Sequence, residues 1–140
     1  MIDRVFHDSL VLVQTDAVRE DVHCEFPHAT LRVLGNGVAI PTETASGDSV
    51  VFVGRLKRQK GVHVLLDAMK DIDEHLLIVG NGPEREQLET IAARKKIDVD
   101  FVGEVEPDTV LEYLMDGKVF VLPSVTGEGL PNALLEAMSV

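Results

Sequence analysis

The chain has 140 residues, of which 45% are apolar, and this suffices for the packed core of one ordinary domain. Its net charge of −11 argues against nucleic-acid binding, because such proteins carry a surplus of Lys and Arg. Cys24 is the only cysteine, which excludes an internal disulfide, and no apolar run reaches the roughly 18 residues of a membrane span. We therefore expect a cytoplasmic protein without an integral membrane segment, with peripheral membrane contact left open.

The first elements in chain order predict a β-α-β unit. Leu10–Val13 is a short apolar run, Asp16 can cap a helix that ends near Glu25, and Leu31–Leu34 is a second strand candidate. A small and polar stretch follows, as is typical of a linker. The expected domains are residues 1–41, a linker at 42–48, and residues 49–140.

Apolar strands alternate with amphipathic helices in the second domain. The predicted strands are Val50–Val53, Leu76–Val79, Asp100–Val102 and Val119–Leu122. Helical spacing is found in Val62, Leu65, Leu66 and Met69, then after Pro83 in Leu88, Ile91 and Ala92, then from Pro107 to Leu114, and finally from Pro131, with Leu134, Ala137 and Met138 facing inward. This alternation predicts a Rossmann-like α/β fold, a parallel sheet flanked by helices on both faces.

A basic loop directly after the strand Val50–Val53 is the first candidate binding motif. It places four cations within six residues, between Gly54 and Gly61. A guanidinium forks two phosphate oxygens and an ammonium adds a movable charge, so Arg55 and Lys60 suit a diphosphate. Ligands of parallel sheets bind at the carboxyl ends of the strands, which favours this function over a merely solvated loop.

A glycine-rich turn, Gly80-Asn81-Gly82-Pro83, follows the next strand. We interpret it as a tight turn that starts a helix rather than as a direct ligand contact. Arg85 follows where a dinucleotide fingerprint would need its third glycine, so NAD binding is disfavoured.

Two carboxylates, Glu128 and Glu136, stand at the start of the last predicted helix with seven residues between them. Carboxylate oxygens accept hydrogen bonds from the neighbouring hydroxyls of a sugar. Glycosidases also pair carboxylates, but the basic loop would have no part in that chemistry. Together with the basic loop, the pair indicates a site for a sugar attached to a diphosphate.

Five motifs occur in order along the second domain. They are Gly54-Arg55 with Lys60-Gly61, Val79-Gly80-Asn81-Gly82-Pro83, Phe101-Val102-Gly103, Leu122-Pro123-Ser124, and Glu128-Gly129-Leu130-Pro131 with Leu135-Glu136-Ala137-Met138. In order and spacing they resemble the retaining group 1 glycosyltransferases of the GT-B fold (family 4). Residues 10–41 resemble the close of that family's first domain. The resemblance implies an incomplete GT-B C-terminal domain with a short piece of the N-terminal domain, and thus a truncated enzyme.

The resemblance implies transfer of a sugar from a nucleotide diphosphate sugar to an acceptor with retention, without a bound metal or other cofactor. Arg55, Lys60 and Glu128 would be the catalytic residues, and the two cations would stabilise the departing diphosphate. Glu128 would contact the donor sugar, Glu136 the ribose, and the backbone near Gly103–Val105 the base. The other donor-binding residues implied are Gly54, Val105, Ser124, Gly129 and Leu130.

Three functions stay open at this point. The first is a glycosyltransferase fragment that is inactive by itself, whose acceptor is a sugar, a lipid-linked sugar or another small molecule. The second is a nucleotide-sugar-binding remnant or scaffold domain without turnover. The third is an epimerase of the same nucleotide sugars, since one group of those enzymes shares this fold.

Overall fold

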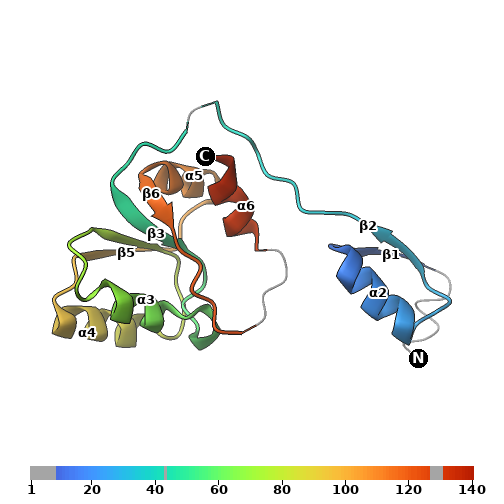
Figure 1. The fold of residues 1–140 in the computed structure, drawn as a ribbon, viewed down its shortest axis with the longest axis horizontal. Coiled ribbons are helices and arrows are strands. Elements are labelled where there is room, and N and C mark those ends of the chain that lie inside the picture. Colours follow the sequence, from blue (N-terminus) through green and yellow to red (C-terminus); the bar gives the residue numbers. More distant parts are fainter. Residues whose placement is uncertain (1–8, 43, 127–130) are drawn as a thin grey trace. The chain divides into compact units, whose positions relative to one another are not determined.

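A computed structural model of the protein describes residues 9–42, 44–126 and 131–140. The chain divides into two compact units, with the boundary between Gly37 and Val38. In the first unit, β1 (Leu10–Val13) pairs in parallel with β2 (Thr30–Val33), and α2 (Asp16–Glu25) connects them (Figure 1). The predicted β-α-β unit is therefore confirmed to within a residue or two at each end.

The N-cap residue of helix α2 (Asp16–Glu25) lies one position earlier than expected. The Thr15 hydroxyl accepts a hydrogen bond from the Val18 amide at 3.2 Å, so Thr15 and not Asp16 is the N-cap residue. Asp16 lies in the first helical turn, where a negative charge is favourable near the helix N-terminus. It also forms an ion pair with Arg19 at 2.9 Å.

The second unit is a four-stranded sheet in the order β5-β4-β3-β6, and all three strand pairs are parallel. Its elements are β3 (Ser49–Val53), the short 3₁₀ helix η1 (Arg58–Lys60), α3 (Val62–Met69), β4 (Leu76–Val79), α4 (Arg85–Lys95), β5 (Val99–Gly103), α5 (Pro107–Met115), β6 (Gly117–Phe120) and α6 (Asn132–Ser139). The expected Rossmann-like sheet is confirmed.

Helices cover both faces of this sheet, with α3 and α4 on one side and α5 and α6 on the other (Figure 1). Successive side chains of a strand point to opposite faces, so Phe52 packs with α3 and α4 whereas Val51 packs with Leu114 of α5. The apolar stripe predicted for α3 is confirmed, because all four of its residues are buried. A fully apolar strand such as β4 is explained by burial on both faces.

Two expectations for the end of the chain are wrong. The last strand is Gly117–Phe120 and not Val119–Leu122, because Gly117 already pairs with Ser49 of β3 and the ladder ends at Phe120. Met138 was expected to face inward, yet it is 75% exposed. Its neighbour Ala137 packs against the sheet instead, and one helical step turns the next side chain by about 100°.

The segment before β3 is bound to the second unit by main-chain hydrogen bonds. The amides of Ser46 and Gly47 both donate to the Met115 carbonyl at 3.1 Å. A Cβ on Gly47 would lie 2.0 Å from the Asp116 carbonyl oxygen, so only glycine fits there. Residues 46 and 47 of the expected linker are thus anchored to the end of α5.

Within the described ranges, no helix has both the length and the apolar character needed to cross a bilayer.

Candidate functional site

Main-chain hydrogen bonds join the loops at the carboxyl edge of the sheet. The Gly54 amide donates to the Val79 carbonyl at 2.9 Å, and the Gly80 amide donates to the Gly103 carbonyl at 2.7 Å. Further along, the Leu56 amide donates to the main-chain carbonyl of Asn81 at 2.9 Å. The loops after β3, β4 and β5 therefore form one connected framework.

Glycine is required where these loops touch. A Cβ on Gly80 would lie 2.1 Å from the Gly54 carbonyl oxygen, and a Cβ on Gly82 would lie 2.4 Å from the Leu56 carbonyl oxygen. Both distances are far shorter than any van der Waals contact, so a larger residue would push the loops apart. The turn Gly80–Pro83 thus packs against the basic loop as well as starting α4.

The framework surrounds a cleft of about 680 Å³. Its walls come from Val53–Arg55 at the end of β3, Val79–Pro83 at the end of β4, Glu104 and Val105 after β5, and Val110 of α5. Open parallel sheets bind ligands at this edge, outside the carboxyl ends of the strands. The volume lies within the usual range for small-molecule sites.

Among the described residues, two charged side chains line this cleft, Arg55 and Glu104. Arg55 is exposed, and its guanidinium makes no hydrogen bond or ion pair with another described residue. The next residue, Leu56, is fully buried and anchors the loop. Because β4 lies between β3 and β5, the cleft has a cationic side at Arg55 and an acidic and apolar side at Glu104 and Val105.

The end of β5 is held by Arg85, the first residue of α4. Its Nη2 donates to the Phe101 carbonyl at 2.9 Å, and its Nε donates to Glu89 at 2.7 Å. This role of Arg85 was not predicted from the sequence. A signal was present, since a cation in the first turn of a helix is at the unfavourable end of the helix dipole and needs another partner.

Three of the predicted donor-binding residues line the cleft together, namely Gly54, Arg55 and Val105. Asn81, Gly82 and Pro83 line it too, although their turn was not expected to contact a ligand, and so does Glu104, which lies within the backbone Gly103–Val105 implied for the base. Their position after β4 and β5 was the available signal, because loops at this edge share one site.

The segments that carry Lys60 and Ser124 lie against each other, but neither residue is among those that line the cleft. Lys60 ends η1, and the preceding Gln59 carbonyl accepts a hydrogen bond from the Val125 amide at 2.9 Å. Gly61 is equally close to this segment, since a Cβ there would lie 1.9 Å from the Pro123 carbonyl oxygen. The basic loop therefore rests on the segment that follows β6.

The predicted carboxylate pair is described only in part. Glu136 lies in α6, partly buried, and is not among the residues that line the cleft. Glu128, Gly129 and Leu130 lie outside the described residues. Within the described part of the chain, no group of three or more His, Cys, Asp or Glu side chains is placed to hold a metal ion.

The parallel sheet and its helical layers have the Rossmann-like fold found in GT-B glycosyltransferase domains. Residues 47–140 match the family model "Glycosyl transferases group 1", and since this is more than half of the chain, the protein belongs to that family.

Relatives and solved structures agree with this family. The colanic acid biosynthesis glycosyltransferase WcaL of Escherichia coli, named as putative, is 36% identical over 103 residues, which cover 65% of this chain and 25% of WcaL. The phosphatidyl-myo-inositol mannosyltransferase of Mycobacterium leprae is 35% identical over 99 residues, which cover 66% of this chain and 26% of that enzyme. The chain thus spans about a quarter of the length of these relatives.

The fold resembles that of HepE from Anabaena in complex with UDP-glucose. The TM-score is 0.78, and the match covers 94% of this chain and 42% of HepE at 20% identity. At that level of identity the likeness establishes the fold alone.

Proposed function

We propose that the cleft holds the nucleoside diphosphate of a sugar nucleotide, and that the chain is part of an enzyme that transfers the sugar to an acceptor. The observation that carries this proposal is Arg55, a guanidinium without a partner among the described residues, in a glycine-rich cleft at the ligand-binding edge of the sheet. The names of the relatives support it, since they are glycosyltransferases, and HepE holds UDP-glucose.

Arg55 suits the phosphate end of such a ligand. A planar guanidinium makes two parallel hydrogen bonds to phosphate oxygens. When the bond between the sugar and the diphosphate breaks, negative charge grows on the leaving group, and a cation already aimed at it lowers the barrier. Lys60 is proposed as the second cation, so that the reaction needs no metal or other cofactor.

The sugar end of the donor is assigned to the segment that follows β6. Glu128 is proposed to contact the sugar and Glu136 the ribose, with Ser124, Gly129 and Leu130 beside them. We further propose that transfer retains the anomeric configuration. The NMR coupling constant of the anomeric proton in the product of the complete enzyme tests this, and an inverted product would contradict it.

The acceptor is proposed to be a sugar or a lipid-linked sugar. WcaL is named for colanic acid biosynthesis and the mycobacterial relative for phosphatidyl-myo-inositol, so both are named for carbohydrate or lipid conjugates. We expect the present chain to bind a donor without transferring its sugar, because its match spans only about a quarter of the relatives' length. A cytoplasmic location stays a prediction. A scaffold without turnover is not favoured, because the named relatives are enzymes.

The first test is a thermal-shift panel with UDP-, GDP- and ADP-sugars. A ligand that binds only the folded state raises the melting temperature. We expect at least one of the three classes to do so. The class that gives the largest shift then serves in titrations of Arg55→Ala, which should lose about 1.5–3 kcal/mol of binding free energy, the value of a hydrogen bond to a charged group.

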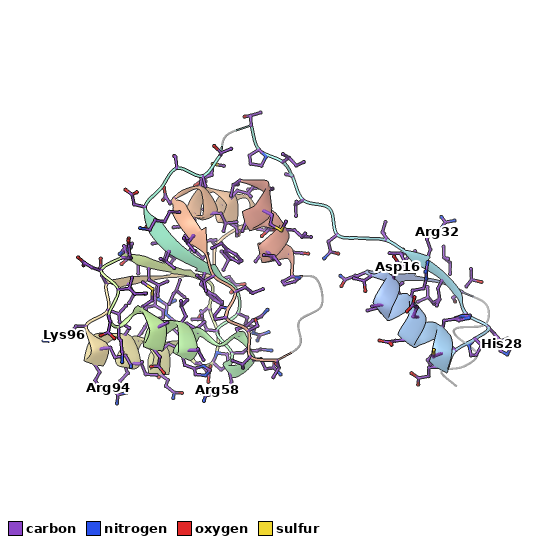
Figure 2. All side chains as sticks on the ribbon, in the orientation of Figure 1. Asp16, His28, Arg32, Arg58, Arg94 and Lys96 are labelled. Atoms are coloured by element: carbon purple, nitrogen blue, oxygen red, sulfur yellow. The ribbon has the colours of Figure 1, made fainter. Side chains whose placement is uncertain are left out.

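Arg58→Ala is the matched control for this titration. Arg58 belongs to the same basic loop and is exposed, but it does not line the cleft, and Figure 2 shows it projecting from the outer surface of the unit. Its loss should leave the affinity nearly unchanged. Equal losses in the two variants would mean that the loop attracts anions only through its general charge, and the proposed contact would be abandoned.

A further inference from the structure

The carboxyl end of β5 departs from regular strand geometry at three points. Ile78 pairs with Phe101 but Val79 pairs with Gly103, so Val102 is an extra residue, a β-bulge. Gly103 has a φ of 95°, which a side chain rarely tolerates. An isolated antiparallel bridge then joins Gly103 to Gly80. These features turn the chain sharply, and the next two residues, Glu104 and Val105, line the cleft.

Arg85 lies against this turn. Its guanidinium donates to the Phe101 carbonyl at the bulge, and a Cβ built on Gly103 would lie 3.2 Å from its Nη1. Glu89, one helical turn further along α4, accepts from Nε at 2.7 Å and fixes the orientation of the guanidinium. The Arg85 side chain is 31% exposed, so much of it is enclosed by these contacts. Arg85 itself is not among the residues that line the cleft.

The cleft has two chemically different ends. Arg55 supplies the cationic end after β3, and Glu104 with Val105 and Val110 supplies the other end after β5. Because β4 lies between them, the two ends are separated by roughly 10 Å, twice the spacing of neighbouring strands. A carboxylate repels phosphates, whereas it accepts hydrogen bonds from ring N–H groups and the valines suit a flat ring. The β5 end therefore fits the base of a nucleotide and the β3 end its phosphates.

We infer that Arg85 is a positioning residue for the base end of the ligand, which acts by holding the turn 103–105 through the Phe101 carbonyl. This inference rests on the proposed function. It separates two roles within one cleft: Arg55 acts on the phosphates, and Arg85 acts on the base without touching it.

The test compares two kinds of ligand, pyrophosphate and nucleoside diphosphates, which share the two phosphates but differ in the presence of a base. The intact chain and Arg85→Gln are titrated with inorganic pyrophosphate and with UDP, GDP and ADP, followed by two-dimensional NMR. In Arg85→Gln, the dissociation constant of the best nucleotide should rise about tenfold. That of pyrophosphate should stay within about a factor of two. Arg85→Lys should recover part of the loss, because an ammonium can donate to Phe101 but lacks the fork that also reaches Glu89.

Arg94→Gln is the control, since it removes the same charge from the last turn of the same helix, and Figure 2 shows Arg94 at the outer surface of α4. It should change neither affinity. If Arg85 were merely structural, Arg85→Gln would raise the dissociation constants of pyrophosphate and nucleotide by the same factor and would also lower the melting temperature. This result would overturn the inference. Unchanged nucleotide affinity would overturn it as well.

The titration of the intact chain separates this inference from the proposed function. If pyrophosphate bound as tightly as every nucleotide, the base would contribute nothing to affinity. The cleft would then bind only the anionic phosphates, and the proposed role of the β5 turn would be overturned. Binding of neither ligand would overturn the proposed function itself, and the inference with it.

Discussion

Gly61 connects η1 to α3 and decides how closely the basic loop approaches the segment after β6. Its φ of 68° is left-handed, and a Cβ there would lie 1.9 Å from the Pro123 carbonyl oxygen. Gly61→Ala should therefore lower the free energy of unfolding by more than the roughly 1–2 kcal/mol of the left-handed conformation alone. Urea unfolding followed by circular dichroism measures this loss.

Gly35→Ala is the reference for that measurement. A Cβ on Gly35 would meet nothing within 4 Å. The substitution should change the free energy of unfolding by no more than about 0.5 kcal/mol. If the two alanine variants were equally stable, the close contact between the loop and Pro123 would be refuted.

Arg55 and Arg85 illustrate what single residues reveal in a sequence. The position of Arg55 at the cleft could be predicted, because a cation directly after a buried strand lies at the edge where parallel sheets bind ligands. For Arg85 the sequence indicates only that a cation in the first helical turn needs a partner; the partner itself could not be predicted, because it is a main-chain carbonyl 16 residues further on. Only the register of β4 and β5 brings Phe101 to the N-terminus of α4, and sequence patterns do not contain that register.

The helices α3 and α4 are joined at the surface by one ion pair. Lys95 Nζ donates to Asp67 Oδ1 at 2.8 Å, and this hydrogen bond lowers the pKa of Asp67 below its usual value of 3.8. A lowered pKa means that the folded state favours the carboxylate. The pair thus stabilises the fold above pH 3.8, and this contribution is lost as the pH falls through the lowered pKa.

Asp67→Asn should accordingly reduce stability at neutral pH, and the difference from the unchanged protein should vanish in more acidic solution. The effect will be small, because the Asp67 side chain is 65% exposed and solvent screens the pair. Urea unfolding at neutral pH and well below pH 3.8 measures it. Asp73→Asn serves as a control, since that exposed carboxylate has no partner among the described residues. A difference that persists in acid would contradict the role of the carboxylate.

Elements whose apolar pattern is complete could be predicted well. The four apolar residues of α3 at helical spacing are all buried, and β4 has the bounds expected from its run of apolar residues. The strand β6 was misplaced, because Gly117 already pairs with Ser49 although it is not part of an apolar run, and because Leu122 continues the apolar run after the last hydrogen bond to β3, from the Val121 amide to the Val51 carbonyl. Hydrophobicity indicates burial, whereas the length of a strand is decided by its hydrogen-bond partners.

The two units differ in their expected response to ligand. Every described residue that lines the 680 Å³ cleft belongs to the unit 38–140. Hydrogen exchange with a saturating nucleotide should therefore slow in peptides that cover Gly54, Gly80 and Gly103, while exchange within residues 9–37 stays unchanged. Slower exchange in the first unit would show that it contributes to binding by the isolated chain.

The loops around the cleft are joined through their main chains and glycines. Gly54, Gly80 and Gly103 form the joints, while the side chains of Arg55, Glu104 and Val105 take no part in them. Substitution of Arg55, Glu104 or Val105 can thus alter which ligand the cleft binds without moving the loops. A combinatorial library confined to Arg55, Glu104 and Val105 should yield folded proteins at high frequency, so the same architecture is suited to diversification towards new ligands.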